Sequence, residues 1–144
     1  MPIPQRQPLE VLVAWLDAMR RQDLQALSDC YAPDVVWRGV VPDAVCHNRQ
    51  EVLDNLAEQL SEGLPRVDAL ELVATDSAVV LGVRSPDLTE VAGVPLAGQL
   101  FNVFTVVDGR IVAVQDHPGR AAALHAAGAK EPVWSDPGSV PLSD

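Results

Sequence analysis

The strongest candidate for chemistry is a carboxylate at the end of an apolar run, in the segment IVAVQDHPG that begins at Ile111. The β-branched residues of this run predict a strand, and Asp116 closes it. Burial among Val, Phe and Trp side chains would favour the neutral acid and raise the pKa of Asp116, which suits a group that transfers protons near neutral pH. Asp116 can also cap a short helix that starts near Pro118 and Gly119, and the two roles are compatible.

A second polar candidate, Asn102, lies in the apolar strand predicted at residues 99–107. A tight turn at Asp108-Gly109 joins this strand to the one that ends on Asp116. A strict two-residue hairpin pairs Asn102 with Gln115, which turns Asn102 and Asp116 to opposite faces. A bulge near Gln115 would bring both to one face, and bulges are common beside active sites. A joint site therefore depends on a bulge.

Aromatic side chains are available to surround these polar groups. Trp37 alternates with Val35 along a predicted strand, so it faces either a ligand pocket or the packed core. Phe104 lies two residues after Asn102 and shares its face of the strand. Asn102 is an amide in an apolar strand, and either a ligand or the backbone can satisfy it.

Another group of polar residues, Asp43, Cys46 and His47, lies in one proline-containing loop. Adjacent Cys and His side chains diverge in an extended loop, and there is no second ligand pair at a useful spacing. We therefore expect no metal site. A single disulfide between Cys30 and Cys46 would be unusual in a small cytosolic core, so both thiols are expected to be reduced.

The elements that must position these residues follow an α+β order. Helices are predicted at residues 8–22, 24–31, 49–62 and 120–127, and strands at 35–41, 66–74, 77–84, 99–107 and 111–116. The first helix has an apolar strip with Leu9 and Val13 and a second strip with Trp15, so we expect burial on more than one side. A sheet curved around this helix would leave a pocket between them. Residues 1–128 form the predicted domain, and residues 129–144 an irregular tail.

Composition limits the class of partner. The 144 residues include 20 acidic and 10 basic side chains, and the net charge of −10 disfavours nucleic acid and anionic membrane surfaces. The apolar stretches are far shorter than the roughly 20 residues of a membrane span. The N-terminus lacks the basic and apolar regions of a signal peptide. We therefore expect a cytoplasmic protein that binds neither nucleic acid nor membranes.

Three segments resemble the nuclear transport factor 2-like superfamily and, within it, the SnoaL-like polyketide cyclases. The segments are YAPDVVWRGVVPDAVCHNRQEVL, GVPLAG and FTVVDGRIVAVQDHPGRAAALHAAG, and they occur in this order over nearly the whole domain. The resemblance implies a cone-shaped α+β barrel, in which a curved antiparallel or mixed sheet wraps around a long N-terminal helix and encloses a deep apolar pocket. It also implies a homodimer formed through the sheet.

The same resemblance implies roles for single residues. In the cyclases an aspartate that closes the last strand is the general acid/base, and Asp116 occupies that position. Limonene epoxide hydrolases also place a catalytic aspartate there, but they add an arginine and a second aspartate near the positions of Val79 and Val80. Steroid-isomerase relatives use a tyrosine on the first helix, where this chain has Trp15.

These observations predict a SnoaL-like protein that binds a small hydrophobic molecule. As an enzyme it would need no cofactor, and Asp116 would transfer protons beside a carbonyl group during cyclisation or isomerisation. Cyclases carry polar side chains at the positions of Leu100 and Asn102, and here only Asn102 can orient a carbonyl. The alternative is a non-catalytic ligand-binding or dimerisation module of the same fold, and an epoxide-hydrolase-like enzyme is the third possibility. The predicted substrate contacts are Asn102, Trp37, Phe104, Trp15, Leu100 and Tyr31.

Overall fold

The structure, a computed structural model, describes residues 7–63, 66–91 and 93–129. The elements within them are α1 (Pro8–Arg21), α2 (Leu24–Cys30), β1 (Tyr31–Arg38), β2 (Val45–Cys46), α3 (Arg49–Ser61), β3 (Ala69–Ala74), β4 (Ala78–Arg84), β5 (Glu90–Val91), β6 (Val94–Pro95), β7 (Gln99–Val107), β8 (Arg110–His117) and α4 (Arg120–Ala127). One sheet has the order β2-β1-β8-β7-β4-β3, and β5 pairs with β6. In this sheet β1 runs parallel to β8, and the other neighbours are antiparallel. The predicted α+β class with a mixed sheet is confirmed.

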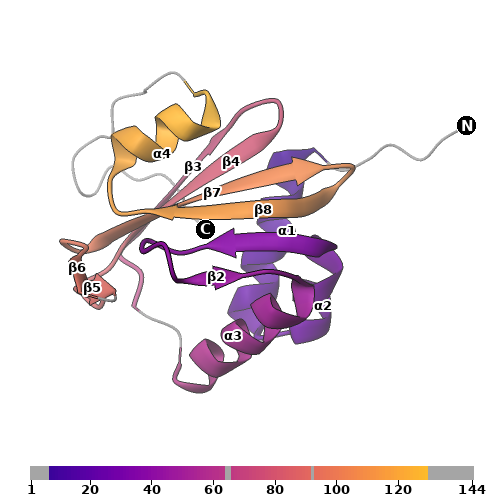
Figure 1. Ribbon diagram of the computed structural model, residues 1–144, viewed down its shortest axis with the longest axis horizontal. Helices are drawn as coiled ribbons and strands as arrows, with labels where there is room; N and C mark the ends of the chain where they lie inside the picture. The colour runs from indigo at the N-terminus through magenta and orange to yellow at the C-terminus, as the bar shows by residue number, and fades with distance from the viewer. Residues whose placement is uncertain (1–6, 64–65, 92, 130–144) are drawn as a thin grey trace, which may run out of the picture.

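The sheet separates two groups of helices (Figure 1). We call the side that carries α1, α2 and α3 the inner face and the side that carries α4 the outer face. The inner core includes Leu12, Val79 and Phe104, and the smaller outer core includes Phe101 and Leu124. The sheet curves around α1 without closing, because its edge strands β2 and β3 do not pair with each other. The predicted curved sheet around the N-terminal helix is therefore confirmed, and this sheet is open.

Only part of the predicted apolar surface of α1 is buried. The helix begins at Pro8, whose fixed backbone angle suits a first-turn position. Its buried residues after Pro8 are Val11, Leu12, Trp15 and Ala18. Leu9 and Val13, which the helical spacing placed in an apolar strip, are 42% and 54% exposed. The strip that contains Trp15 is the one that faces the sheet.

β1 begins earlier than predicted. The sequence pattern predicts the preceding helix up to residue 31 and the strand at residues 35–41, but α2 ends at Cys30 and β1 starts at Tyr31. Pro33 lies inside the strand, between the paired residues Tyr31 and Val36, where the register against β8 shifts. Proline has no backbone N–H to donate, so such an irregular stretch accommodates it.

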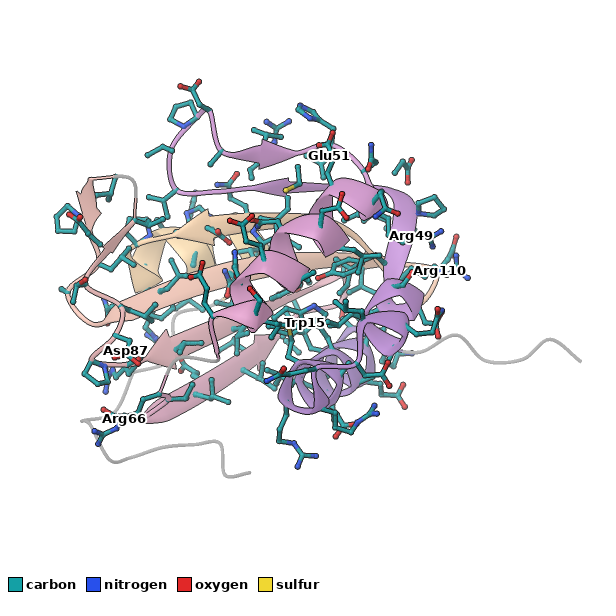
Figure 2. All side chains as sticks on the ribbon, turned by 90° about the horizontal axis from the view of Figure 1, so that it is seen from below. Trp15, Arg49, Glu51, Arg66, Asp87 and Arg110 are labelled. Carbon is teal, nitrogen blue, oxygen red and sulfur yellow. The ribbon has the colours of Figure 1, made fainter. Side chains whose placement is uncertain are left out.

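The segment between β4 and β7, predicted as a loop over residues 85–98, contains the β5–β6 hairpin. Ser85 closes this segment, since its backbone N–H donates to the carbonyl of Gly98 at 2.9 Å. The backbone N–H of Arg66 donates to the Asp87 carboxylate at 2.8 Å, which ties the segment before β3 to the same loop (Figure 2). These contacts lie at the end of the sheet where β8 terminates, because Arg84 pairs with Gln99 there.

The last described helix is α4. α4 ends at Ala127, and Gly128 follows in a left-handed conformation with a φ of 73°. The predicted tail of residues 129–144 lies outside the described residues except for Ala129, which packs against the outer core. Among the described helices, none is long and apolar enough to cross a membrane.

Candidate active site

The β7–β8 hairpin has the predicted turn. Asp108 and Gly109 have φ angles of 53° and 78°, the left-handed conformations that a tight two-residue hairpin turn requires. Next to the turn, Val107 pairs with Arg110, as a strict hairpin demands. The Asp-Gly dipeptide therefore sets the register at the start of β8.

A bulge then changes this register. Val106 pairs with Ile111, but Thr105 pairs with Ala113, so Val112 is an extra residue in β8. A bulge of this kind shifts the pairing of all later residues by one position. The sequence predicts that Asn102 and Asp116 share a site only if β8 contains a bulge near Gln115. The structure contains a bulge at Val112, three residues earlier in the strand.

Beyond the bulge, Asn102 pairs with Asp116. Paired residues of an antiparallel ladder point to the same face, here the inner one, which Phe104 and Val114 also occupy. The two polar groups are therefore neighbours at the end of the sheet where β8 terminates. The strict-hairpin alternative, with Asn102 opposite Gln115, is excluded.

Asp116 accepts two hydrogen bonds on a single oxygen. The indole Nε1–H of Trp37 donates to Oδ1 at 2.9 Å, and the amide Nδ2 of Asn102 donates to the same atom at 2.6 Å. No hydrogen bond from the described residues reaches Oδ2. A carboxylate oxygen accepts through two lone pairs, and both are engaged on Oδ1. A proton that binds Asp116 therefore binds at Oδ2.

The surroundings of Asp116 explain its acidity. Burial raises its pKa from the ordinary 3.8 to about 6, because a carboxylate loses hydration there. The hydrogen bonds from Trp37 and Asn102 favour the ionised form and limit this rise. Both donors are neutral groups, so they stabilise the charge without a permanent ion pair. A carboxyl group with this pKa is present in both its neutral and its ionised form around pH 6.

Three aromatic rings pack together, and one of them, Trp37, contacts Asp116. The ring centroids of Trp37 and Phe104 are 5.7 Å apart, and those of Trp15 and Phe104 are 5.0 Å apart. Trp15 lies between α1 and the sheet, and its Nε1–H donates to the hydroxyl of Tyr31 at 2.7 Å (Figure 2). The indole N–H groups of Trp15 and Trp37 thus both donate to acceptors within the protein, so the rest of each ring is an apolar surface.

The two remaining predicted substrate contacts are Leu100 and Tyr31. Leu100 is half-buried and lies two residues before Asn102, so it shares the inner face of β7. Tyr31 is fully buried at the opposite end of β1, six residues before Trp37. Burial raises the pKa of the Tyr31 hydroxyl, which remains a neutral partner of Trp15. The structure therefore brings Asp116, Asn102, Trp37, Phe104 and Trp15 together and connects Tyr31 through Trp15.

Gln115 and Cys46 also lie near the centre, and the sequence predicts no role for either of them in the proton-transfer site. Gln115 extends to the outer face, where its Nε2 donates to the backbone carbonyls of Gly39 and Asp116. Cys46 pairs with Trp37 across the β1–β2 ladder and packs against the inner core. Burial raises the pKa of the Cys46 thiol, which opposes nucleophilic use. Cys30 and Cys46 are both free thiols.

The loop that precedes α3 is exposed at its polar residues. Asp43 and His47 both lie at the surface, and the ring Nδ1 of His47 is 3.2 Å from a carboxylate oxygen of Glu51. Within the described ranges, no group of three or more His, Cys, Asp or Glu side chains is placed to hold a metal ion.

Comparison with protein families identifies the fold. The model of the SnoaL-like domain matches residues 12–114, which is most of the chain. The chain belongs to the SnoaL-like domain family. The match ends two residues before Asp116, so the family assignment does not itself assign a role to this carboxylate. A search of curated proteins found no match.

Solved structures support the same fold for this SnoaL-like protein. A candidate polyketide cyclase from Sinorhizobium meliloti is 21% identical, with a TM-score of 0.59, over 75% of this chain and 94% of its own. A SnoaL-like protein of unknown function from Burkholderia thailandensis is 20% identical, with a TM-score of 0.61, over 81% and 98%. IdmH, a candidate polyketide cyclase from Streptomyces antibioticus, is 21% identical, with a TM-score of 0.57, over 85% and 98%.

Proposed function

We propose that this SnoaL-like protein binds a small hydrophobic molecule and catalyses cofactor-free proton transfer beside a carbonyl group, as in a cyclisation or isomerisation. Asp116 is the catalytic acid/base. The observation that carries the proposal is the environment of this residue, in which Oδ1 is held by two neutral donors and burial raises the pKa to about 6.

The proposed step uses the two oxygens of Asp116 differently. Ionised Asp116 removes a proton from the carbon next to the substrate carbonyl through Oδ2, and the electron pair of the broken C–H bond moves into an enolate. The neutral acid then returns the same proton to another atom of the substrate and regenerates the carboxylate. A base is most effective when its pKa lies near the working pH, which the environment of Asp116 provides.

Asn102 and the aromatic rings have supporting roles in this proposal. An amide nitrogen carries two N–H groups, and Asp116 takes one of those of Asn102. The second is the group we assign to the substrate carbonyl or enolate oxygen. Trp15, Trp37, Phe104 and Leu100 form apolar walls and exclude water, which strengthens the hydrogen bonds at the site.

The alternative is a non-catalytic ligand-binding or dimerisation module. The packing of Trp15, Trp37 and Phe104 against one another favours it, because rings that contact each other fill part of the inner core. An epoxide-hydrolase-like relay has less support. Val79 is an apolar core residue on the inner face, and Trp37 and Asn102 supply the donors that contact Asp116.

Substitution of Asp116 by Asn tests the proposal. Native mass spectrometry of the purified protein first identifies any co-purified ligand. NMR in D₂O then follows the exchange of protons on the carbon next to the carbonyl group of that ligand. If no ligand co-purifies, an aryl β-diketone is the probe. We expect Asp116→Asn to slow exchange by about 10²- to 10⁴-fold with little change in ligand affinity. Asp108→Asn, the same change at the exposed hairpin turn, is the control and should exchange at the wild-type rate. Equal rates in all three proteins favour the binding module.

We also propose that the protein is a homodimer. α4 contacts β4, β7 and β8 on the outer face, and Val36 and Ala113, which pair across β1 and β8, are half-buried residues of the same face. Such an apolar sheet surface is suited to a second copy of the chain. Sedimentation at micromolar concentration should give about twice the chain mass of 15.4 kDa, and a monomer over that range contradicts this proposal.

A further inference from the structure

Gln115 lies directly before Asp116 in β8, and its side-chain amide donates hydrogen bonds to two backbone carbonyls beside the site. Its Nε2 donates to the carbonyl oxygen of Gly39 at 3.3 Å and to that of Asp116 at 3.0 Å. Both partners are carbonyl oxygens, which only accept, so the amide nitrogen must face them. The two N–H groups of this amide are therefore both used.

These bonds extend the connection between β1 and β8 beyond the end of their ladder. The last paired residues are Arg38 and Gln115, and Gly39 is the next residue after the strand. Trp37, two residues before Gly39, is the residue whose indole reaches Asp116. Gln115 on the outer face and the Trp37–Asp116 bond on the inner face thus join the same two segments.

Gly39 fixes the return of the chain toward β2 at this point. Its backbone N–H donates to the carbonyl of Ala44 at 2.6 Å. A Cβ on Gly39 would lie 2.8 Å from the Cβ of Ala44, so this close approach requires glycine. The Gly39 carbonyl therefore belongs to a tight turn toward β2, and the Gln115 amide connects this turn to β8.

We propose that Gln115 is a positioning residue, which holds the end of β1 so that the Trp37 indole stays within hydrogen-bonding distance of Asp116. This inference concerns the geometry of the proposed acid/base but does not require catalysis to be tested. Without the amide, the end of β1 beyond Arg38 loses its connection to β8 on the outer face, and the Trp37–Asp116 distance becomes free to lengthen.

The test is Gln115→Met, which keeps the length of the side chain and removes both N–H donors. The titration of Asp116 is followed by ¹³C NMR of its carboxyl group from pH 5 to 8, together with the Trp37 indole resonance. We expect the apparent pKa of Asp116 to rise by about 0.5 or more, because the bond from Trp37 favours the ionised form. In Gln115→Asn the side chain is one methylene group shorter, so its nitrogen no longer reaches the two carbonyls. This variant should also raise the pKa of Asp116, and it replaces the Met variant if that protein does not fold.

Two controls separate positioning from a general loss of stability. Gln50→Met removes an exposed amide that bonds Asp54 on α3, and it should leave the titration unchanged. In a Trp37→Phe background, Gln115→Met should no longer shift the pKa of Asp116, since the bond through which it acts is gone. An unchanged titration in Gln115→Met and Gln115→Asn, or the same shift with and without Trp37, overturns the proposal. This experiment does not depend on proton-exchange activity. A protein without that activity would contradict the proposed function but not the positioning role of Gln115.

Discussion

Asn102 and Asp116 face each other across the β7–β8 ladder, with the amide nitrogen 2.6 Å from the carboxylate oxygen, because β8 contains one more residue than its hairpin needs. That extra residue is Val112. If Val112 were instead paired in a regular ladder, the residue opposite Asn102 would be Gln115, and Asp116 would point away from α1. In this chain, the pairing of Asn102 with Asp116 therefore requires that Val112 stays outside the regular ladder.

Deletion of Val112 should preserve the site. With this residue removed, the two arms of the hairpin have equal lengths, and a regular ladder keeps all pairs from Thr105–Ala113 to Asn102–Asp116. What changes is the local bend that a bulge adds to a strand. We expect the carboxyl resonance of Asp116 to titrate near 6 in the deletion variant, as in the wild type. A titration near the ordinary value of 3.8 would show that Asp116 has left the inner face.

Trp37→Phe should raise the pKa of Asp116 above its wild-type value of about 6. The variant keeps an aromatic ring beside Phe104 but removes the N–H that donates to Oδ1. Because that bond favours the ionised carboxylate, its loss makes the proton harder to remove. The measurement is the NMR titration of the carboxyl group.

Trp15→Phe is the matched control for this prediction. It removes an indole N–H from the same aromatic cluster, but the lost partner is the buried Tyr31 hydroxyl. We expect this variant to lower the free energy of unfolding by about 1–3 kcal/mol, since a buried polar group loses its partner. The titration of Asp116 should not move. An equal pKa shift in both variants would assign the effect to packing instead of the Trp37 hydrogen bond.

The local signals in the sequence were sufficient for the hairpin and the last helix. Asp108-Gly109 is a strong turn signal, and it defines β7 and the start of β8. Gly128, which can adopt a left-handed conformation, follows the end of α4 as predicted. Asp116 and Asn102 were also recognisable, because each is a polar residue within an apolar strand.

The features that could not be predicted depend on contacts between distant segments. The location of the bulge at Val112 is set by which side chains the inner core accepts, and a turn motif fixes only the first pairs of a hairpin. Proline disfavours regular strands, and the irregular pairing of β1 with β8 that accommodates Pro33 cannot be recognised from local sequence. The hydrogen bond from Gln115 to the Gly39 carbonyl could not be predicted either, because it joins the ends of two different strands.

Glu71→Gln should weaken the attachment of α4. The guanidinium of Arg120 donates to both carboxylate oxygens of Glu71, at 2.9 and 2.8 Å, and the two side chains are only 13% and 17% exposed. Removal of one charge from a largely buried pair leaves the other poorly compensated, so we expect a loss of about 2–3 kcal/mol in the free energy of unfolding. Hydrogen exchange of the α4 amides should become faster.

The control for this pair is Asp68→Asn. The Arg66–Asp68 pair has a similar N–O distance of 3.0 Å, but its side chains are 73% and 49% exposed. Exposed pairs contribute little because water screens them, and we expect a change below about 0.5 kcal/mol in urea denaturation. Equal losses in Glu71→Gln and Asp68→Asn would mean that the contact between Arg120 and Glu71 does not anchor the helix.

The raised pKa of Asp116 predicts a specific dependence of stability on pH. Folding raises this pKa from 3.8 to about 6, so between these values the folded state binds the proton more tightly than the unfolded state does. The free energy of unfolding therefore decreases as the pH rises from about 4 through about 6, and the contribution of Asp116 is constant above about 7. The shift corresponds to a cost of about 3 kcal/mol for the ionised residue at pH 8.

Asp116→Asn removes this cost while its side-chain oxygen can still accept from Trp37 and Asn102. We expect the variant to be more stable than the wild type by about 3 kcal/mol at pH 8 and by about half as much at pH 5. Other titrating groups are common to both proteins, so the difference between their urea-denaturation curves isolates Asp116. A difference that does not vary with pH would mean that Asp116 titrates alike in the folded and unfolded chains. The predicted gain in stability, combined with lost proton exchange, would show that the buried carboxylate is retained for chemistry at the expense of stability.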